Sequence, residues 1–174
     1  LVHQGVSLEW LDSTKIIVGS GDYLNTTVDF ELTAVNASSQ IGTSNYIAGG
    51  FIASNVEGEI VTLGRGGSDY SAAIYGNVLE ATSVEIWSDV NGVQSADPRK
   101  VRGTIGIENL SYEEAFEMAH FGAKVLYPPS VLPLRNKKIP LFLKNTSAPD
   151  QVGTHISNQN LSELHKIQGV SSLS

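Results

Sequence analysis

The segment Ile60-Val-Thr-Leu-Gly-Arg-Gly-Gly-Ser-Asp-Tyr-Ser-Ala-Ala73 decides the fold class. Its first four residues are mostly β-branched and predict a short buried strand that ends in a glycine-rich loop. After that loop, Ser68 or Asp69 is placed to cap a helix that we expect to run to about Ala81. A strand, a loop and a helix in succession form the basic unit of an α/β domain.

The sequence on both sides continues this alternation of short strands and helices. The expected strands are Lys15–Gly19, Asn45–Ser54, Val84–Trp87 and Ile139–Leu143. The expected helices are Thr27–Ser38 and one opened by the capping box Ser111–Glu114 and ended at Gly122. A further short element, of a type the pattern leaves open, is expected to start at Pro128-Pro129. Between Ser88 and the capping box, turn formers predict a loop or a hairpin. We therefore expect an α/β domain with a largely parallel sheet.

Composition narrows the classes of function. A net charge of −7 in 174 residues argues against a general nucleic-acid or anionic-membrane surface. The absence of cysteine excludes disulfides and thiolate chemistry, and no apolar run approaches the roughly 18 residues of a membrane span. The opening residues also lack the pattern of a signal peptide. These features predict a soluble protein of the cytoplasm.

The glycine-rich loop Gly64–Gly67 is the first candidate site. Glycines let the backbone approach a ligand closely, and the helix N-terminus that follows offers N–H groups and a positive dipole end. Arg65 can grip a carboxylate or a phosphate, while Ser68 and Asp69 can bind hydroxyl or amino groups. An ordinary tight turn with an N-cap explains the spacing equally well, because the loop matches neither the P-loop nor the dinucleotide fingerprint.

Polar residues after the strand at Val84–Trp87 form the second candidate site. Ser88 and Asp89 are placed to meet a base or a ribose, and Arg99 to meet phosphates. The alternative is Asx-turn chemistry with a surface ion pair, and the pattern alone favours that alternative.

Lys124 is the third candidate, because it follows a helix-ending glycine and can act as a point-charge partner for phosphate. A lysine in this position is more often simply exposed to solvent. The histidines show no metal-ligand spacing, so we do not expect a zinc site built by the protein. Six scattered acids are expected to be helix-end or solvent-facing charges: Asp12, Asp22, Asp29, Glu80, Glu113 and Glu117.

Three long stretches, taken in order, resemble the motifs of aspartokinases. They are TLGRGGSDYSAA, VEIWSDVNGVQSADPRKV and LSYEEAFEMAHFGAKVLYPPSVLP, and the spelling of SADPRKV and YPPS is most similar to the bifunctional aspartokinase–homoserine dehydrogenase type. The resemblance implies the amino-acid kinase fold, a three-layer αβα sandwich with a mainly parallel central sheet. It also implies ATP-dependent phosphorylation of the L-aspartate side-chain carboxylate to 4-phospho-L-aspartate, the first step of lysine, threonine and methionine biosynthesis.

The resemblance carries roles onto individual positions. The implied catalytic residues are Arg65, Asp69 and Lys124. The implied aspartate-binding residues are Arg65, Gly66, Gly67, Ser68 and Asp69. The implied ATP-binding residues are Ser88, Asp89, Gln94, Asp97, Arg99, Lys124 and Val125. Ser88 replaces a commoner threonine but keeps the hydroxyl, and Gln94 stands where many relatives have tyrosine or methionine.

The implied partners are L-aspartate and ATP, with Mg²⁺ carried on the nucleotide, and a homo-oligomer is expected for the full-length protein, with no nucleic-acid or membrane partner. Residues 1–157 are expected to form the C-terminal part of the kinase domain, and residues 158–174 a linker and the start of an ACT-type regulatory domain. The family's N-terminal Lys-Phe-Gly-Gly-Thr and Ser-x-Gly-Glu motifs are not in this sequence. Two alternatives therefore stay open: a noncatalytic nucleotide-binding or assembly fragment, and a family member with another acceptor.

Overall fold

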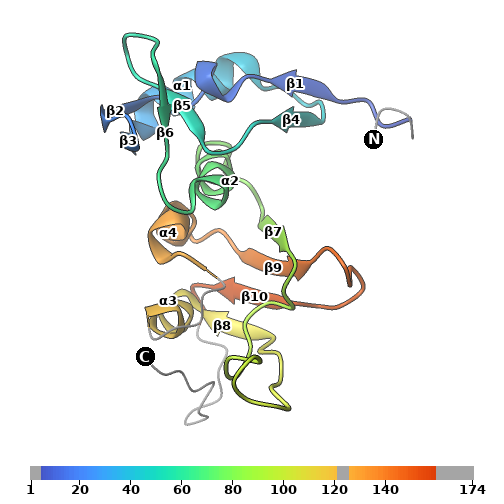
Figure 1. Cartoon of the computed structure of the whole chain (residues 1–174). Coiled ribbons are helices and arrows are strands. Elements are labelled where there is room, and N and C mark those ends of the chain that lie inside the picture. Colours follow the sequence, from blue (N-terminus) through green and yellow to red (C-terminus); the bar gives the residue numbers. More distant parts are fainter. Residues whose placement is uncertain (1–4, 121–125, 160–174) are drawn as a thin grey trace. The chain divides into compact units, whose positions relative to one another are not determined.

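A computed structural model describes residues 5–120 and 126–159 of the chain (Figure 1). The chain divides into two compact units, Leu1–Glu80 and Ala81–Ser174, which we call the first and second units. Within the described residues, no helix has both the length and the apolar character needed to cross a bilayer.

The first unit combines three short strand pairs with two α-helices (Figure 1). The strands are β1 (Glu9–Leu11), β2 (Gly19–Asp22), β3 (Asn25–Val28), β4 (Tyr46–Ala48), β5 (Ile52–Ser54) and β6 (Ile60–Thr62). β1 runs parallel to β4, whereas β2–β3 and β5–β6 are antiparallel pairs. The helices are the 3₁₀ turn η2 (Ser13–Lys15), α1 (Phe30–Gln40) and α2 (Gly67–Val78).

The core of the first unit is an apolar cluster drawn from nearly every element. Its buried members are Leu11, Ile16, Ile17, Val28, Ala37, Ala53, Val61, Leu63 and Ile74. Burial of these side chains is the main favourable contribution to folding of the unit. Val61 of β6, Leu63 just before the glycine-rich loop and Ile74 of α2 belong to this cluster, so the core fixes the two elements that flank the loop.

Carboxylates cap the helices of the first unit. Asp29 Oδ1 accepts a hydrogen bond from the backbone N–H of Leu32 at 2.9 Å, and Asp12 Oδ1 accepts one from that of Thr14 at 3.1 Å. A negative charge is favourable at this end of a helix because the exposed N–H groups carry partial positive charge. The prediction that Asp12 and Asp29 are helix-end charges is confirmed.

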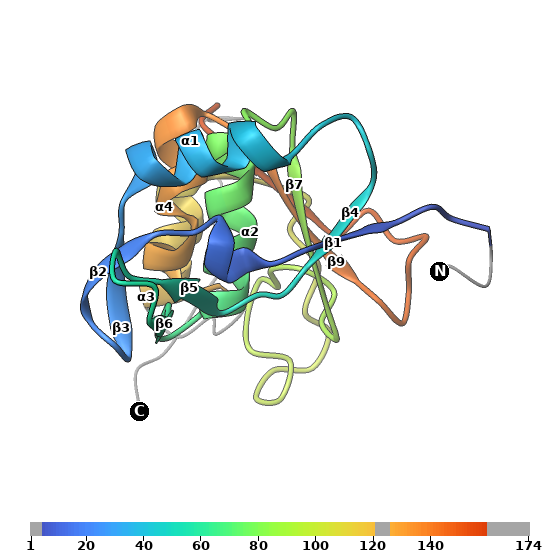
Figure 2. The same cartoon turned by 90° about the horizontal axis from the view of Figure 1, so that it is seen from above.

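Over residues 81–120 and 126–159, the second unit consists of a four-stranded sheet and two helices. Its strands are β7 (Val84–Ser88), β8 (Asn109–Ser111), β9 (Leu141–Asn145) and β10 (Thr154–Ser157), in the order β7-β9-β10-β8. β7–β9 and β10–β8 are parallel pairs, and β9–β10 is antiparallel. Figures 1 and 2 show its helices, α3 (Tyr112–His120) and α4 (Pro128–Lys137), on one side of this sheet.

Alternation along the strands explains how this sheet is buried on one face. Leu110, Leu141, Leu143 and Ile156 are almost completely buried. Within β9, Phe142 and Lys144 alternate with the two buried leucines, and on the adjacent strand β7 Glu85 and Trp87 are exposed, because successive side chains in a strand point to opposite faces. Tyr112, the first residue of α3, is fully buried and its hydroxyl donates to the carbonyl of Ile139 at 2.8 Å.

The expected α/β class with parallel strands is confirmed, as are several local signals. The capping box forms as predicted, because Ser111 Oγ accepts from the Glu114 N–H at 3.1 Å and Glu114 Oε2 accepts from the Ser111 N–H at 2.7 Å. The strand beginning at Val84 is also present, and the short element expected at Pro128 is the helix α4. The predicted helix end at Gly122 lies outside the described residues.

Other boundaries were wrong, and each error has a local cause. The strand predicted at Asn45–Ser54 is two strands, because the chain turns at Gly49-Gly50-Phe51. Apolar residues 16–18 are buried, but they follow the 3₁₀ turn capped by Asp12 instead of forming a full strand. The helix predicted from Thr27 begins at Phe30, since Thr27 and Val28 belong to β3.

Two strands of the second unit were missed altogether. β8 and β10 lie in polar stretches whose short alternation gave no clear strand signal, and they become strands because each pairs with the other in parallel register. The strand β9, which lies next to β10 in the sheet, was predicted at Ile139–Leu143 and is found two residues later, at Leu141–Asn145.

Candidate functional site

The loop between β6 and α2 takes its shape from glycines in left-handed conformations. Gly64 and Gly66 both have a φ of 70°, a value that costs other residues steric strain. Gly66 is the N-cap of α2, the N–H of Gly67 donates to the carbonyl of Gly64 at 3.0 Å, and the N–H of Tyr70 donates to that of Gly66 at 2.8 Å. The prediction that Ser68 or Asp69 caps the helix was therefore wrong, and both residues lie in its first turn.

The start of α2 is suited to hold an anion. Among the described residues, no side chain forms a capping hydrogen bond to this helix. Arg65 in the loop and Ser68 in the first turn of the helix are both exposed. Asp69 is partly buried, and the resulting desolvation of the carboxylate raises its pKa. Backbone N–H groups, a helix dipole and a guanidinium together favour binding of a carboxylate or a phosphate.

Phe51 supports this loop and was missed by the sequence reasoning. Its N–H donates to Ser71 Oγ at 2.8 Å, and its carbonyl accepts from the Leu63 N–H at 2.9 Å. Ser71 Oγ in turn donates to the carbonyl of Gly67 at 2.8 Å. The only signal in the sequence was the Gly49-Gly50 pair, which indicated a break in the predicted strand but not a contact with a loop further along the chain.

The second candidate site begins where β7 ends, as predicted. Ser88 is the last residue of β7 and its carbonyl accepts two hydrogen bonds from Thr146, from the N–H at 2.8 Å and from Oγ1 at 2.9 Å. Ser88 Oγ accepts a long hydrogen bond of 3.4 Å from the N–H of Val90. Asp89, next in the chain, is exposed. The strand end thus presents a hydroxyl and a carboxylate side by side.

Thr154 ties down the base of the segment that follows, which sequence reasoning also missed. It is fully buried, and its Oγ1 accepts from the Val93 N–H at 2.8 Å and donates to the Ile107 carbonyl at 2.7 Å. Gly92 has a φ of 66° and packs so closely on Thr154 that a Cβ there would overlap Oγ1. One hydroxyl from β10 therefore joins both strands of the segment at its base.

The segment after β7, which was predicted to be a loop or a hairpin, is hairpin-like. Gln94 pairs with Gly106 in an antiparallel bridge, and the Ser95 N–H donates to the Ile105 carbonyl at 2.9 Å. Gln94 Nε2 donates to the carbonyl of Asn91 at 2.9 Å. The amide of Gln94 is thus occupied in holding the base of the hairpin.

Asx-turn chemistry and a surface ion pair, the alternative predicted for this segment, are both present, and the structure assigns them to Asp97 and Arg99. Asp97 Oδ1 accepts from the backbone N–H of Arg99 and from its Nε, both at 3.0 Å, and Nη2 lies 3.0 Å from Oδ2. The guanidinium lowers the pKa of the Asp97 carboxyl to about 2. Arg99 is 75% exposed, so this pair leaves the cation within reach of a phosphate. An Asx-turn and a phosphate contact are compatible at this position.

Two of the expected nucleotide-site residues, Lys124 and Val125, lie outside the described residues. In the part of the chain that is described, no group of three or more histidine or acidic side chains is arranged to hold a metal ion.

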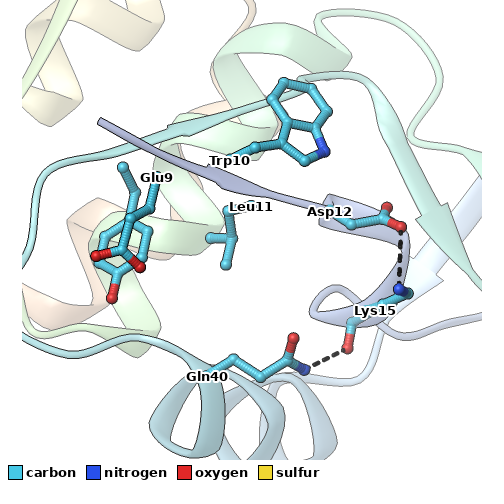
Figure 3. Close-up of a pocket in the computed structure, with 7 residues that line it drawn as sticks. Glu9, Trp10, Leu11, Asp12, Lys15 and Gln40 are labelled. Carbon is cyan, nitrogen blue, oxygen red and sulfur yellow. Dashed lines mark hydrogen bonds and ion pairs between the residues drawn. The ribbon is translucent and has the colours of Figure 1, made fainter. Parts of the chain in front are cut away.

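An open pocket of about 450 Å³ lies elsewhere in the first unit, against β1, η2 and the end of α1 (Figure 3). Its lining residues are Glu9, Trp10, Leu11, Asp12, Lys15, Gln40 and Tyr46. Lys15 Nζ lies 3.9 Å from Asp12 Oδ2, and the backbone carbonyl of Lys15 accepts a hydrogen bond from Gln40 Nε2 at 3.2 Å. None of the site residues expected from the sequence lines this pocket.

Comparison with known proteins finds a matching protein family and similar individual proteins. Residues 3–145 match the sequence model described as the Amino acid kinase family. The bifunctional aspartokinase/homoserine dehydrogenase of Buchnera aphidicola is 44% identical over 166 residues, which cover 94% of this chain and 20% of that protein. The chain therefore spans about a fifth of that relative's length.

Solved structures agree with the sequence match. The crystal structure of Escherichia coli aspartokinase III in complex with aspartate and ADP has a TM-score of 0.86 and 36% sequence identity, and the match covers 94% of this chain and 37% of that chain. UMP kinase from Bacillus anthracis, with a TM-score of 0.55 and 14% identity over 89% of this chain and 59% of that one, shares only the fold.

Proposed function

The chain belongs to the amino acid kinase family, and on that premise we propose that it is part of an aspartokinase. The proposed reaction is ATP-dependent phosphorylation of the L-aspartate side-chain carboxylate, which opens a route of amino-acid biosynthesis. The observation that carries the proposal is the β6–α2 loop, where left-handed glycines, an exposed arginine and an uncapped helix start, among the described residues, form a receptor for a small carboxylate. Similarity to an enzyme solved with aspartate and ADP supports it.

The acceptor site in this proposal is the start of α2. Arg65 binds a carboxylate of aspartate through paired N–H donors, and the backbone of Gly66 and Gly67 allows close approach. Ser68 and Asp69 bind the remaining polar groups of the substrate. Asp69 is the member suited to an ammonium group, because a partly buried carboxylate gains most from a cationic partner.

The nucleotide site in this proposal uses the end of β7 and the hairpin beyond it. Ser88 and Asp89 bind the nucleoside, Arg99 meets the phosphates, and Gln94 and Asp97 hold the hairpin in place. Lys124 and Val125 complete the set of proposed ATP contacts. Mg²⁺ enters with ATP as part of the substrate, because phosphate oxygens and waters are ligands that this ion accepts readily.

The chemistry asked of these residues is positioning and charge neutralisation. A β-carboxylate oxygen of aspartate attacks the γ-phosphorus in line, a new P–O bond forms, and the bond from phosphorus to the β,γ-bridging oxygen breaks so that its electron pair leaves with ADP. The attacking oxygen is already an anion, so no general base is needed. Arg65, Arg99 and Lys124 instead offset the repulsion between two anionic substrates.

Further parts of the proposal concern the whole protein. We propose that residues 1–157 form the C-terminal part of a kinase domain, and that residues 158–174 form a linker and the start of an ACT-type regulatory domain. We also propose a homo-oligomer that acts in the cytoplasm.

Hydroxylamine trapping tests the function directly. The protein at its full encoded length is incubated with MgATP, hydroxylamine and either L-aspartate or L-glutamate, and the acyl phosphate is detected as its hydroxamate. We expect product with aspartate alone. Product with glutamate alone would replace the proposed acceptor, and absence of product with both, while ATP still binds, would favour a noncatalytic nucleotide-binding protein.

A further inference from the structure

Phe51 has a backbone conformation that its position does not explain locally. Among the described residues, three that are not glycine have positive φ: Phe51 at 75°, Glu80 at 50° and Lys138 at 58°. Glu80 and Lys138 follow the ends of α2 and α4, where a left-handed residue commonly ends a helix. Phe51 lies between β4 and β5 and ends no helix. A bulky residue in this region is a true outlier, and such strain often marks a functional constraint.

The neighbouring sequence makes the outlier more informative. Gly49 and Gly50 come directly before Phe51, yet neither has positive φ. Gly50 packs at contact distance on α2, since a Cβ there would lie 3.4 Å from Ser68 Cα and 3.7 Å from Ser71 Oγ. The glycine faces the first turn of α2, and the phenylalanine takes the strained conformation.

The contacts of Phe51 reach both ends of the glycine loop. Its carbonyl accepts from Leu63, the residue before the loop, and its N–H donates to Ser71 in the first turns of α2. Its ring covers Gly67, where a Cβ would overlap Cδ2 of the ring and lie 3.1 Å from Cε2. A single residue therefore holds the start and the end of Gly64–Gly67 at a fixed separation.

We propose that Phe51 is a positioning residue for the acceptor site. It holds the β6–α2 loop in the conformation that presents Arg65 and the N–H groups of α2 to the substrate carboxylate. The backbone strain at Phe51 persists because the two hydrogen bonds and the ring contact with Gly67 offset it. What the loop binds rests on the proposed function, whereas the mechanical role of Phe51 rests on these contacts alone.

The substitution Phe51→Gly, made in the protein at its full encoded length, separates strain from positioning. Glycine accepts the left-handed backbone without strain but leaves Gly67 uncovered. Lys138→Gly is the matched control, because it also relieves a left-handed residue but lies at the end of α4 in the second unit. Phe51→Tyr is the conservative variant, since it keeps the ring against Gly67.

Hydrogen exchange gives a readout that does not depend on catalysis. We expect Phe51→Gly to speed amide exchange in peptides covering residues 64–71 by roughly tenfold, while peptides covering residues 93–107 keep their rates. Lys138→Gly and Phe51→Tyr should leave exchange in residues 64–71 unchanged. Unchanged exchange in Phe51→Gly would overturn the inference, whatever the enzyme does.

Kinetics then test what the loop positions. We expect Phe51→Gly to raise the aspartate KM by about tenfold, while its ATP KM stays within about twofold of wild type. The variant Phe51→Tyr should keep the aspartate KM of wild type. Equal rises in both KM values with a lower Tm would indicate a general structural role and overturn the inference. If the wild-type protein shows no activity with aspartate but Phe51→Gly still speeds exchange in residues 64–71, the positioning role of Phe51 is supported and the proposed acceptor is rejected.

Discussion

The two candidate loops are held in opposite ways. The β6–α2 loop is fixed from outside itself, by Phe51, which contacts residues 12 and more positions further along the chain. The tip of the hairpin after β7 is fixed from within, by Asp97 and Arg99, which are two positions apart. The base of that hairpin, by contrast, is held by a residue distant in sequence, through the hydroxyl of Thr154.

This difference bears on how each loop can act. A loop fixed by the packed core keeps its donors in place before substrate arrives, which suits recognition of a small ligand by geometry. An exposed cation held by one neighbouring carboxylate can exchange that partner for a phosphate at little cost, because ion pairs at the surface contribute little free energy. The first loop is thus suited to discriminate, and the second to adapt to a flexible, highly charged nucleotide.

Replacement of Arg65 and of Arg99 should have the largest effects of the substitutions considered for the two loops. We expect Arg65→Ala to raise the aspartate KM by about 10- to 100-fold, since charge-assisted hydrogen bonds contribute about 1.5–3 kcal/mol each. Arg99→Ala should instead raise the ATP KM, and by the smaller factor. Steady-state kinetics with each substrate varied in turn will check this. A rise in the same KM for both variants would contradict the assignment of separate sites.

Gly67→Ala tests whether the first loop depends on its contact with Phe51. A Cβ there would displace the ring of Phe51, so we expect the free energy of unfolding to fall by about 1–3 kcal/mol in urea denaturation. Gly42→Ala is the control, because its nearest neighbour is Tyr46 Oη at an ordinary 3.6 Å. In a Phe51→Ala background the cost of Gly67→Ala should largely disappear, and strict additivity of the two substitutions would argue against the contact.

Thr154→Val tests how much the buried hydroxyl at the base of the hairpin contributes to stability. It leaves the Val93 N–H and the Ile107 carbonyl without their partner, at a cost of about 1–3 kcal/mol for burying unsatisfied groups. Thr146→Val removes an exposed hydroxyl that bonds to the Ser88 carbonyl, so water can replace it and stability should change by less than about 0.5 kcal/mol. Thermal unfolding of both variants compares them; equal losses would show that the buried hydroxyl is not special.

The smallest expected effect is the pH dependence of the hairpin tip. Because the pKa of Asp97 is lowered from 3.8 to about 2, its pairing with Arg99 is fully present above pH 4 and is lost as the pH falls through about 2. NMR titration of Asp97 should give that value, and in Arg99→Gln the pKa should return toward 3.8. An unchanged pKa in the variant would mean that other groups hold the carboxylate in its charged form.

Local signals in the sequence predicted local structure well. The capping box at Ser111 specifies its own hydrogen bonds, since both partners lie within four residues, and Pro128 can begin a helix because its missing N–H is not needed there. The Asx-turn at Asp97 was predicted for the same reason. The glycine loop and its place between a strand and a helix were also evident from residue types alone.

What the sequence by itself determined about this protein is therefore its class, its short-range motifs and the residues able to carry charge. Only the tertiary structure decided which strands pair, that Gly66 and not Ser68 or Asp69 caps α2, and that Phe51 and Thr154 hold the two loops. The physical reason is range. A cap or a turn is satisfied by near neighbours, whereas a strained φ or a polar stretch becomes favourable only when a distant segment supplies its hydrogen bonds and packing.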